Sequence, residues 1–141
     1  MAAIDTLLAE ERAGLVRLDP LAAVAAWCDG ALLVDIRPEA QRRAEGEVPG
    51  AILIERNVLE WRLDPTSPHS LPEVLGHHQP ILILCSEGYA SSLAAATLRR
   101  LGLVNATDVA GGFKAWRRAG LPASGGRSHG PEAMVSVHCE E

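Results

Sequence analysis

Short hydrophobic runs alternate with more polar segments along most of the chain. Residues 31–36 and 81–84 are almost wholly apolar, which predicts strands buried on both faces of a sheet. Similar short segments at 15–18, 51–54 and 107–110 predict further strands. Helices are predicted between them, at residues 4–13, 20–27, 39–45, 91–100 and 113–118. Strands that alternate with helices are typical of an α/β domain with a mostly parallel sheet.

The pattern fits one domain in a chain of 141 residues, of which 48% are hydrophobic. We expect this domain to occupy residues 1–122, with its core at about 15–121. The stretch 55–79 is rich in Pro, Ser and His and predicts loops with short helical turns. From residue 123 onward the pattern dissolves into Ser, Gly and single charges, which predicts a flexible C-terminal tail over 123–141.

Composition narrows the class of function. The net charge of −5 argues against a basic face for nucleic acid, and no apolar run reaches the roughly 20 residues of a membrane span. The N-terminus lacks the basic and apolar regions of a signal peptide. Three cysteines, without a CxxC pair, suggest a reducing cytoplasm and offer no zinc site. We therefore expect a cytoplasmic protein without metal or cofactor, and the excess of Arg over Lys fits a GC-rich bacterial genome.

The most informative segment begins at Cys85, directly after the predicted strand 81–84. A six-residue loop with Gly88 in its middle leads to a helix that begins near Ser91. Ligand sites in open α/β sheets lie at the carboxyl ends of strands. A short loop curled around one atom points backbone N–H groups inward, and the first turn of the helix adds more. Such a cradle favours a cysteine thiolate, although a buried, inert core cysteine is the alternative.

Four motifs occur in order along the chain: the Asp-x-Arg pair at Asp35 and Arg37, the turn G-E-V-P-G-A at 46–51, the loop C-S-E-G-Y-A-S at 85–91, and G-G-F-K-A-W at 111–116. Together they resemble the motifs of the rhodanese-like family. The resemblance implies a rhodanese-like α/β fold: a five-stranded, mostly parallel sheet flanked by helices on both faces.

The resemblance also implies a sulfurtransferase. A small-molecule or protein donor, such as thiosulfate or a persulfide, would leave a sulfane sulfur on the catalytic Cys85, and a thiol or cyanide would remove it. The implied partners are that donor and acceptor, in a monomer or homodimer. The loop that would bind the donor consists of Ser86, Glu87, Gly88, Tyr89, Ala90 and Ser91.

Four charged residues are candidates for a supporting role. Asp35 and Arg37 are predicted to form an ion pair that supports the fold or the Cys85 loop. Arg56 and Arg62 are basic residues that would either face the pocket or lie in solvent. Glu87 is a departure from thiosulfate-specialised members, which often carry Arg or Lys in the loop. Its carboxylate would disfavour dianionic thiosulfate. Two alternatives are that it pairs with Arg37, Arg56 or Arg62, or that it simply faces the solvent.

Two alternatives to a sulfurtransferase remain open. One is a non-catalytic rhodanese-fold interaction module. A phosphatase-like hydrolase is less favoured, because phosphatases with a similar cradle place an Arg six residues after the Cys, where this chain has Ser91. Two further pairs are interpreted as incidental: His77 and His78 as a surface loop without metal, and His138-Cys139 as part of the tail.

Overall fold

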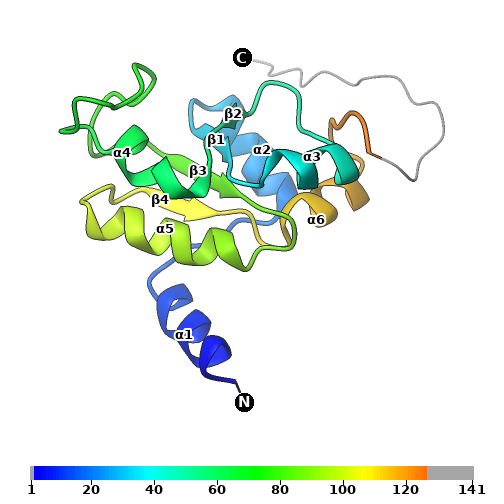
Figure 1. Ribbon diagram of the computed structural model, residues 1–141, viewed down its shortest axis with the longest axis horizontal. Helices are drawn as coiled ribbons and strands as arrows, with labels where there is room; N and C mark the ends of the chain where they lie inside the picture. Colours follow the sequence, from blue (N-terminus) through cyan, green and yellow to red (C-terminus); the bar gives the residue numbers. More distant parts are fainter. Residues whose placement is uncertain (1, 127–141) are drawn as a thin grey trace.

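The computed structural model describes residues 2–126 of the chain. Its sheet has four parallel strands in the order β2-β1-β3-β4, formed by Ile52–Leu53, Leu32–Asp35, Ile81–Leu84 and Ala106–Asp108. The helices are α1 (Ala3–Arg12), α2 (Pro20–Cys28), α3 (Glu39–Glu45), α4 (Leu59–Leu63), α5 (Ala90–Arg100) and α6 (Gly112–Arg118), and a 3₁₀ turn, η1, spans Arg56–Val58. Figure 1 shows the sheet between two layers of helices, with α1 projecting below α5. The α/β class predicted from the sequence is confirmed.

The prediction of five strands is wrong by one. The segment 15–18 contributes a single parallel bridge, between Leu18 and Val109, and forms no strand. Its pairing stops there because Asp19 already caps the next helix, accepting a hydrogen bond from the Ala22 N–H at 2.8 Å, and Pro20 occupies the first helical position. The segment therefore anchors the edge of the sheet beside β4 without extending it.

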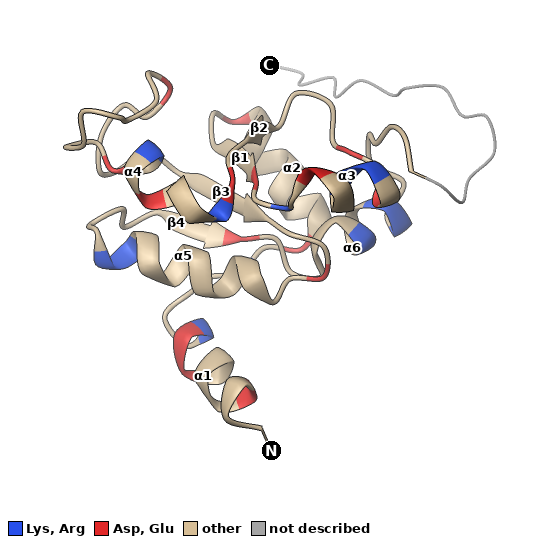
Figure 2. Ribbon diagram, viewed as in Figure 1, with Lys and Arg blue, Asp and Glu red and all other residues tan. Residues whose placement is uncertain are grey.

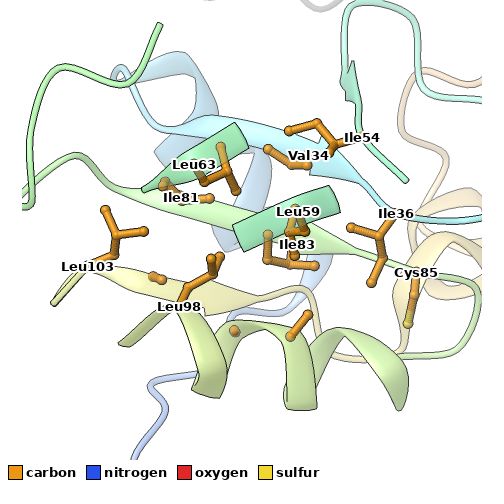
Figure 3. Close-up of a cluster of buried hydrophobic side chains, with 13 residues drawn as sticks. Val34, Ile36, Ile54, Leu59, Leu63, Ile81, Ile83, Cys85, Leu98 and Leu103 are labelled. Carbon is orange, nitrogen blue, oxygen red and sulfur yellow. The ribbon is translucent and has the colours of Figure 1, made fainter. Parts of the chain in front are cut away.

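Each face of the sheet buries its own hydrophobic cluster, because alternate side chains of a strand point to opposite faces. On one face Val34, Ile81 and Ile83 pack with α4 and α5 (Figure 3). On the other face Leu33, Leu82 and Leu84 pack with Ala23 of α2 and with Phe113 and Trp116 of α6. Every residue of β3 is buried, as the apolar run 81–84 predicted, so this strand is the fixed centre from which the next loop leaves.

The first residues of the predicted tail belong to the folded domain. Ser124 exchanges two backbone hydrogen bonds with Glu47, at 2.7 and 2.8 Å, and Ala123 is buried. The indole N–H of Trp116 donates to the carbonyl of Pro122 at 2.9 Å. The predicted start of the tail at residue 123 is therefore too early. Residues 127–141, which include His138 and Cys139, lie outside the described residues. None of the helices in the described range is both long and apolar enough to cross a membrane.

Candidate active site

Cys85 lies at the carboxyl end of β3, the central buried strand. It is only 6% exposed, and its side chain lies at the edge of the hydrophobic cluster, beside Ile36 (Figure 3). The loop that follows turns back directly into α5, which begins at Ala90. The thiol thus lies where a buried strand opens toward the surface, the position at which α/β sheets carry their ligand sites.

Two backbone amides point at the sulfur. The N–H of Gly88 donates to Cys85 Sγ at 3.2 Å, and the N–H of Ser91, in the first turn of α5, donates at 3.4 Å. First-turn amides have no partner within their own helix, so this one is available to the sulfur. Gly88 adopts φ of +89°, a conformation that residues with a side chain rarely adopt. The cradle expected from the spacing of the loop is therefore present around Cys85.

The outer side of this loop is held by three donors on one carbonyl. The oxygen of Gly88 accepts from Arg12 Nη2 at 2.8 Å, Arg17 Nη2 at 2.9 Å and Ser92 Oγ at 3.1 Å. Behind them lies Asp108, which is fully buried at the end of β4. Its carboxylate accepts from Arg17, from Ser92 at 3.1 Å and from Ser91 Oγ at 2.7 Å, so the start of α5 is fixed to the sheet.

The N-terminal end of α6 holds the other end of the loop. The N–H of Phe113 donates to the Cys85 carbonyl at 2.8 Å, and that of Lys114 donates to the Ser86 carbonyl at 3.0 Å. The contact requires glycine at position 112, because a Cβ atom there would lie 2.6 Å from the Cys85 oxygen. The second glycine of the 111–116 motif is thereby explained by the close approach of two backbones.

A chain of side chains links Ser86 to β1. The hydroxyl of Ser86 donates to Glu45 Oε2 at 2.7 Å, Glu45 Oε1 accepts from Arg37 at 3.0 Å, and Arg37 Nη2 pairs with Asp35 at 2.6 Å. The Asp35–Arg37 pair is buried, and the Arg37 guanidinium lies over the Phe113 ring. Asp35 and Arg37 therefore form the predicted ion pair, and through Glu45 they also contact the Cys85 loop.

Burial and hydrogen bonding act in opposite directions on the carboxyl of Glu45. Burial by itself raises its pKa, but the hydrogen bonds from Ser86, Arg37 and Gln41, with the charge of Arg37, lower the pKa below the ordinary value. Arg37 is subject to the same two effects. Burial lowers its pKa, but the hydrogen bonds and charges of Asp35 and Glu45 raise it above the ordinary value. Both groups are therefore held in their charged forms beside the loop.

A pocket of about 420 Å³ opens beside Cys85. Ile36, Pro38 and Ala90 give it apolar walls, and Gln41 and Asn57 add amide groups. Four charged residues complete the lining: Arg37, Glu39, Glu55 and Arg56. Within the described residues, no group of three His, Cys, Asp or Glu side chains could hold a metal ion.

The basic residues of the pocket are already paired. Arg37 is bound to Asp35 and Glu45, and Arg56 Nη1 donates to both oxygens of Glu60, at 2.9 and 2.8 Å. Of the two alternatives for Arg56, facing the pocket or lying in solvent, the structure shows the first.

Arg62 and the loop residues Glu87 and Tyr89 have other contacts. Arg62 donates to the carbonyl of His69 and is not among the residues that line the pocket. Glu87 pairs with Lys114 at 3.0 Å, and their hydrogen bond raises the pKa of Lys114. The alternative that Glu87 pairs with Arg37, Arg56 or Arg62 is therefore wrong. Tyr89 is exposed and lies against the guanidinium of Arg12.

Sequence reasoning missed several residues of the site, including Glu39 and Glu55 of the pocket lining and Arg12, Arg17, Glu45 and Asp108 around the loop. Among the residues around the loop, Asp108 alone carried a signal, because a carboxylate inside a short buried strand needs a partner. Arg12, Arg17 and Glu45 make contacts with the loop that span 41 to 76 positions of the chain. No local pattern predicts such pairs.

Comparisons with known proteins show the family to which the chain belongs. The profile of the rhodanese-like domain matches residues 21–119, and the chain belongs to this family. It is 32% identical over 104 residues to the thiosulfate sulfurtransferase GlpE of Pseudomonas entomophila, covering 72% of this chain and 84% of that protein. It is 34% identical over 92 residues, or 62% of this chain, to an adenylyltransferase and sulfurtransferase of Oryza sativa subsp. japonica, of which the match spans only 20%.

Two solved structures are similar over most of the chain. One is a Rhodopseudomonas palustris protein of unknown function, described as a possible tyrosine phosphatase, with a TM-score of 0.78, 31% identity and coverage of 88% of this chain and 96% of that one. The other is the polysulfide-sulfur transferase homodimer of Wolinella succinogenes, with a TM-score of 0.70, 25% identity and coverage of 88% of each chain. The resemblance found in the sequence motifs is thereby confirmed.

Proposed function

We propose that this protein is a sulfurtransferase that carries a sulfane sulfur on Cys85. The observation that supports this most directly is the pair of backbone N–H groups, from Gly88 and Ser91, that donate to the Cys85 sulfur. Amides fixed in this way favour the anionic form of the sulfur, and the thiolate is the nucleophile in cysteine chemistry. The sulfurtransferases among the relatives give independent support.

The reaction would proceed in two displacements at sulfur. The Cys85 thiolate attacks the outer sulfur of the donor, a new S–S bond forms, and the donor leaves as sulfite from thiosulfate or as a thiolate from a persulfide. An acceptor nucleophile, a thiolate or cyanide, then attacks the outer sulfur of the Cys85 persulfide. The S–S bond breaks and its electron pair returns to Cys85, so the enzyme is regenerated without an external oxidant or reductant.

The charges of the pocket favour one class of donor. Glu39 and Glu55 line the pocket, while its two arginines are held by carboxylates. Glu39 also pairs with Arg43 at 3.3 Å, but both side chains are largely exposed, so this ion pair is weak. A dianion such as thiosulfate would enter against a negative field, whereas a neutral or cationic persulfide would not. We therefore propose a persulfide, small or protein-bound, as the preferred donor. Glu87 is not part of the pocket lining, and its carboxylate pairs with Lys114.

A phosphatase reaction has weaker support. The description of the Rhodopseudomonas palustris neighbour as a possible tyrosine phosphatase favours testing it. However, residues 86–91 contain no Arg to bind a phosphate dianion, and Arg37 and Arg56 already bind carboxylates. We expect an aryl phosphate to be hydrolysed at the background rate.

Intact-mass measurement after incubation with sulfane donors tests the proposal. We expect the wild type to gain one sulfur atom from at least one donor, cyanide to remove it, and the Cys85→Ser variant to gain none. The donor panel should include thiosulfate, a neutral alkyl persulfide and an aminoalkyl persulfide. Absence of any gain with all three would refute the proposal and favour the non-catalytic interaction module.

A further inference from the structure

The Cys85 loop contains no basic residue of its own, yet two guanidinium groups lie against its outer side. Arg12 is in the last turn of α1, and Arg17 lies between α1 and α2. Both donate to the Gly88 carbonyl, at 2.8 and 2.9 Å. In Figure 2 the end of α1 nearest α5 carries a basic residue next to acidic ones. Both arginines precede the residues that match the family profile, which begin at 21.

Gly88 connects these arginines to the reacting sulfur. Its carbonyl accepts the external hydrogen bonds, and its own N–H donates to Cys85 Sγ at 3.2 Å. A glycine in the left-handed region has wide backbone freedom, so contacts from outside the loop must select its orientation. Two charge-assisted hydrogen bonds to one carbonyl are strong enough to do so. Arg12 and Arg17 therefore help to keep the amide directed at the sulfur.

The two arginines differ in charge balance. Arg17 forms an ion pair with the buried Asp108, at 2.9 Å. Among the contacts of the described residues, Arg12 has no carboxylate: it donates to Ser92 Oγ at 2.9 Å and to Gly88, and it lies over the Tyr89 ring, 5.5 Å from its centre. The positive charge of Arg12 is thus the less compensated of the two beside an anionic sulfur.

We propose that Arg12 is a positioning residue for Cys85, so that helix α1 completes the active site from outside the core of the family domain. Arg12 would act by fixing the Gly88 peptide and by adding positive potential behind the loop. This inference rests on the proposed function only in taking Cys85 as the reacting group.

The test compares Arg12→Gln with Arg100→Gln. Arg100 of α5 pairs with Glu11 of α1 at 3.0 Å, so its variant also removes an ion pair between α1 and α5, but one without a contact to the loop. We expect alkylation of Cys85 by the neutral reagent iodoacetamide to be about tenfold slower in Arg12→Gln, since a charge-assisted hydrogen bond and a nearby cation are lost. Arg100→Gln should remain within about twofold of the wild type.

A second variant and a second measurement separate positioning from folding. Arg12→Lys keeps the charge and reaches only one acceptor, so we expect a rate about threefold below the wild type, with an unchanged thermal unfolding midpoint. The ultraviolet absorbance of the thiolate, taken as the difference from Cys85→Ser, should fall in Arg12→Gln. Equal alkylation rates in the wild type, Arg12→Gln and Arg12→Lys, or equal slowing in Arg12→Gln and Arg100→Gln, would overturn the inference.

Alkylation needs no sulfur donor, so the two proposals fail separately. If the wild type takes up no sulfur but Arg12→Gln still slows alkylation, only the proposed function is wrong. If persulfide forms normally while Arg12→Gln leaves alkylation and thiolate absorbance unchanged, only the role of Arg12 is wrong.

Discussion

The hydroxyl of Ser86 donates a 2.7 Å hydrogen bond to the carboxylate of Glu45, which joins the residue after Cys85 to the end of α3. Glu45 in turn accepts from Arg37, the buried guanidinium at the end of β1. The Cys85 loop is therefore connected to the sheet through side chains as well as through its own backbone. The charge on Glu45 maintains this connection.

The Glu45→Gln variant should reveal the connection through the pH dependence of stability. Because the pKa of Glu45 is lowered from its ordinary value of 4.5 in the folded state, its ionised form stabilises the fold above that pH. The contribution is lost as the pH falls through the lowered folded value. We expect the variant to be about 1 kcal/mol less stable at neutral pH, by analogy with other charged hydrogen bonds.

Urea unfolding of the wild type and Glu45→Gln, at neutral pH and in acid, measures this difference. The two proteins should converge in stability as the pH falls below the folded pKa of Glu45. A gap that stays constant or widens in acid would contradict the assignment.

The Asp108→Asn variant should lose stability through its buried network. The carboxylate accepts from Arg17 and from both serines at the start of α5, and no part of Asp108 is exposed. Removing one partner of a buried ion pair costs about 3 kcal/mol, because the remaining charge keeps its desolvation cost. The free energy of unfolding, from urea titration, checks this value.

Glu11→Gln is a suitable control for Asp108→Asn, since Glu11 belongs to the ion pair with the exposed Arg100. Such a pair contributes under about 1 kcal/mol. Similar losses of unfolding free energy in the two variants would contradict the view that the buried network of Asp108 stabilises the fold.

The Gly112→Ala variant should disturb the Cys85 loop. Gly112 has φ of +64°, and an added Cβ would lie 2.6 Å from the backbone oxygens of Cys85 and Ser86. Gly120 provides the control, with φ of +76° and nothing within 4 Å of an added Cβ. We expect Gly120→Ala to cost about 1 kcal/mol for its backbone conformation alone, and Gly112→Ala to cost clearly more.

Persulfide formation distinguishes the two glycine variants further. Gly112→Ala should react with sulfane donors at least about tenfold more slowly, because the amide cradle shifts with the loop. Gly120→Ala should react at the wild-type rate. Equal rates in the two variants would mean that the contact between α6 and the loop does not position Cys85.

The double variant Glu39→Gln and Glu55→Gln should use thiosulfate better than the wild type. Both carboxylates line the pocket, and removing two negative charges lowers the repulsion of a dianion. We expect kcat/KM for thiosulfate to rise about threefold at low ionic strength, and the gain to shrink in salt as screening increases. For a neutral persulfide, kcat/KM should be the same in the double variant and the wild type.

Glu73→Gln, which removes one charge, is the control for each of the two substitutions made singly, because Glu73 is also exposed and is not among the pocket residues. A similar gain for thiosulfate in Glu73→Gln would mean that total charge, not the pocket, governs the donor. No gain in the double variant would refute the electrostatic argument for persulfide donors.

Local patterns were enough to predict the strand 81–84, the loop at 85–91 and the helix after it, and hence the position of Cys85. These features are encoded locally: an apolar run forms a buried strand, and the spacing of Cys85, Gly88 and Ser91 fits a tight loop at a helix start. The α/β class followed from the alternation of such segments, and the rhodanese-like family followed from the order of four motifs.

The charged residues that contact the loop could be identified only from the three-dimensional packing. Arg12 and Arg17 reach Gly88 across 76 and 71 positions, and Ser86 reaches Glu45 across 41. Charged residues of this kind look alike in sequence whether they pair or lie in solvent, and the packing of helices on the sheet selects their partners. The same reason explains Glu87, whose pairing with Lys114 depends on the start of α6 lying beside the loop.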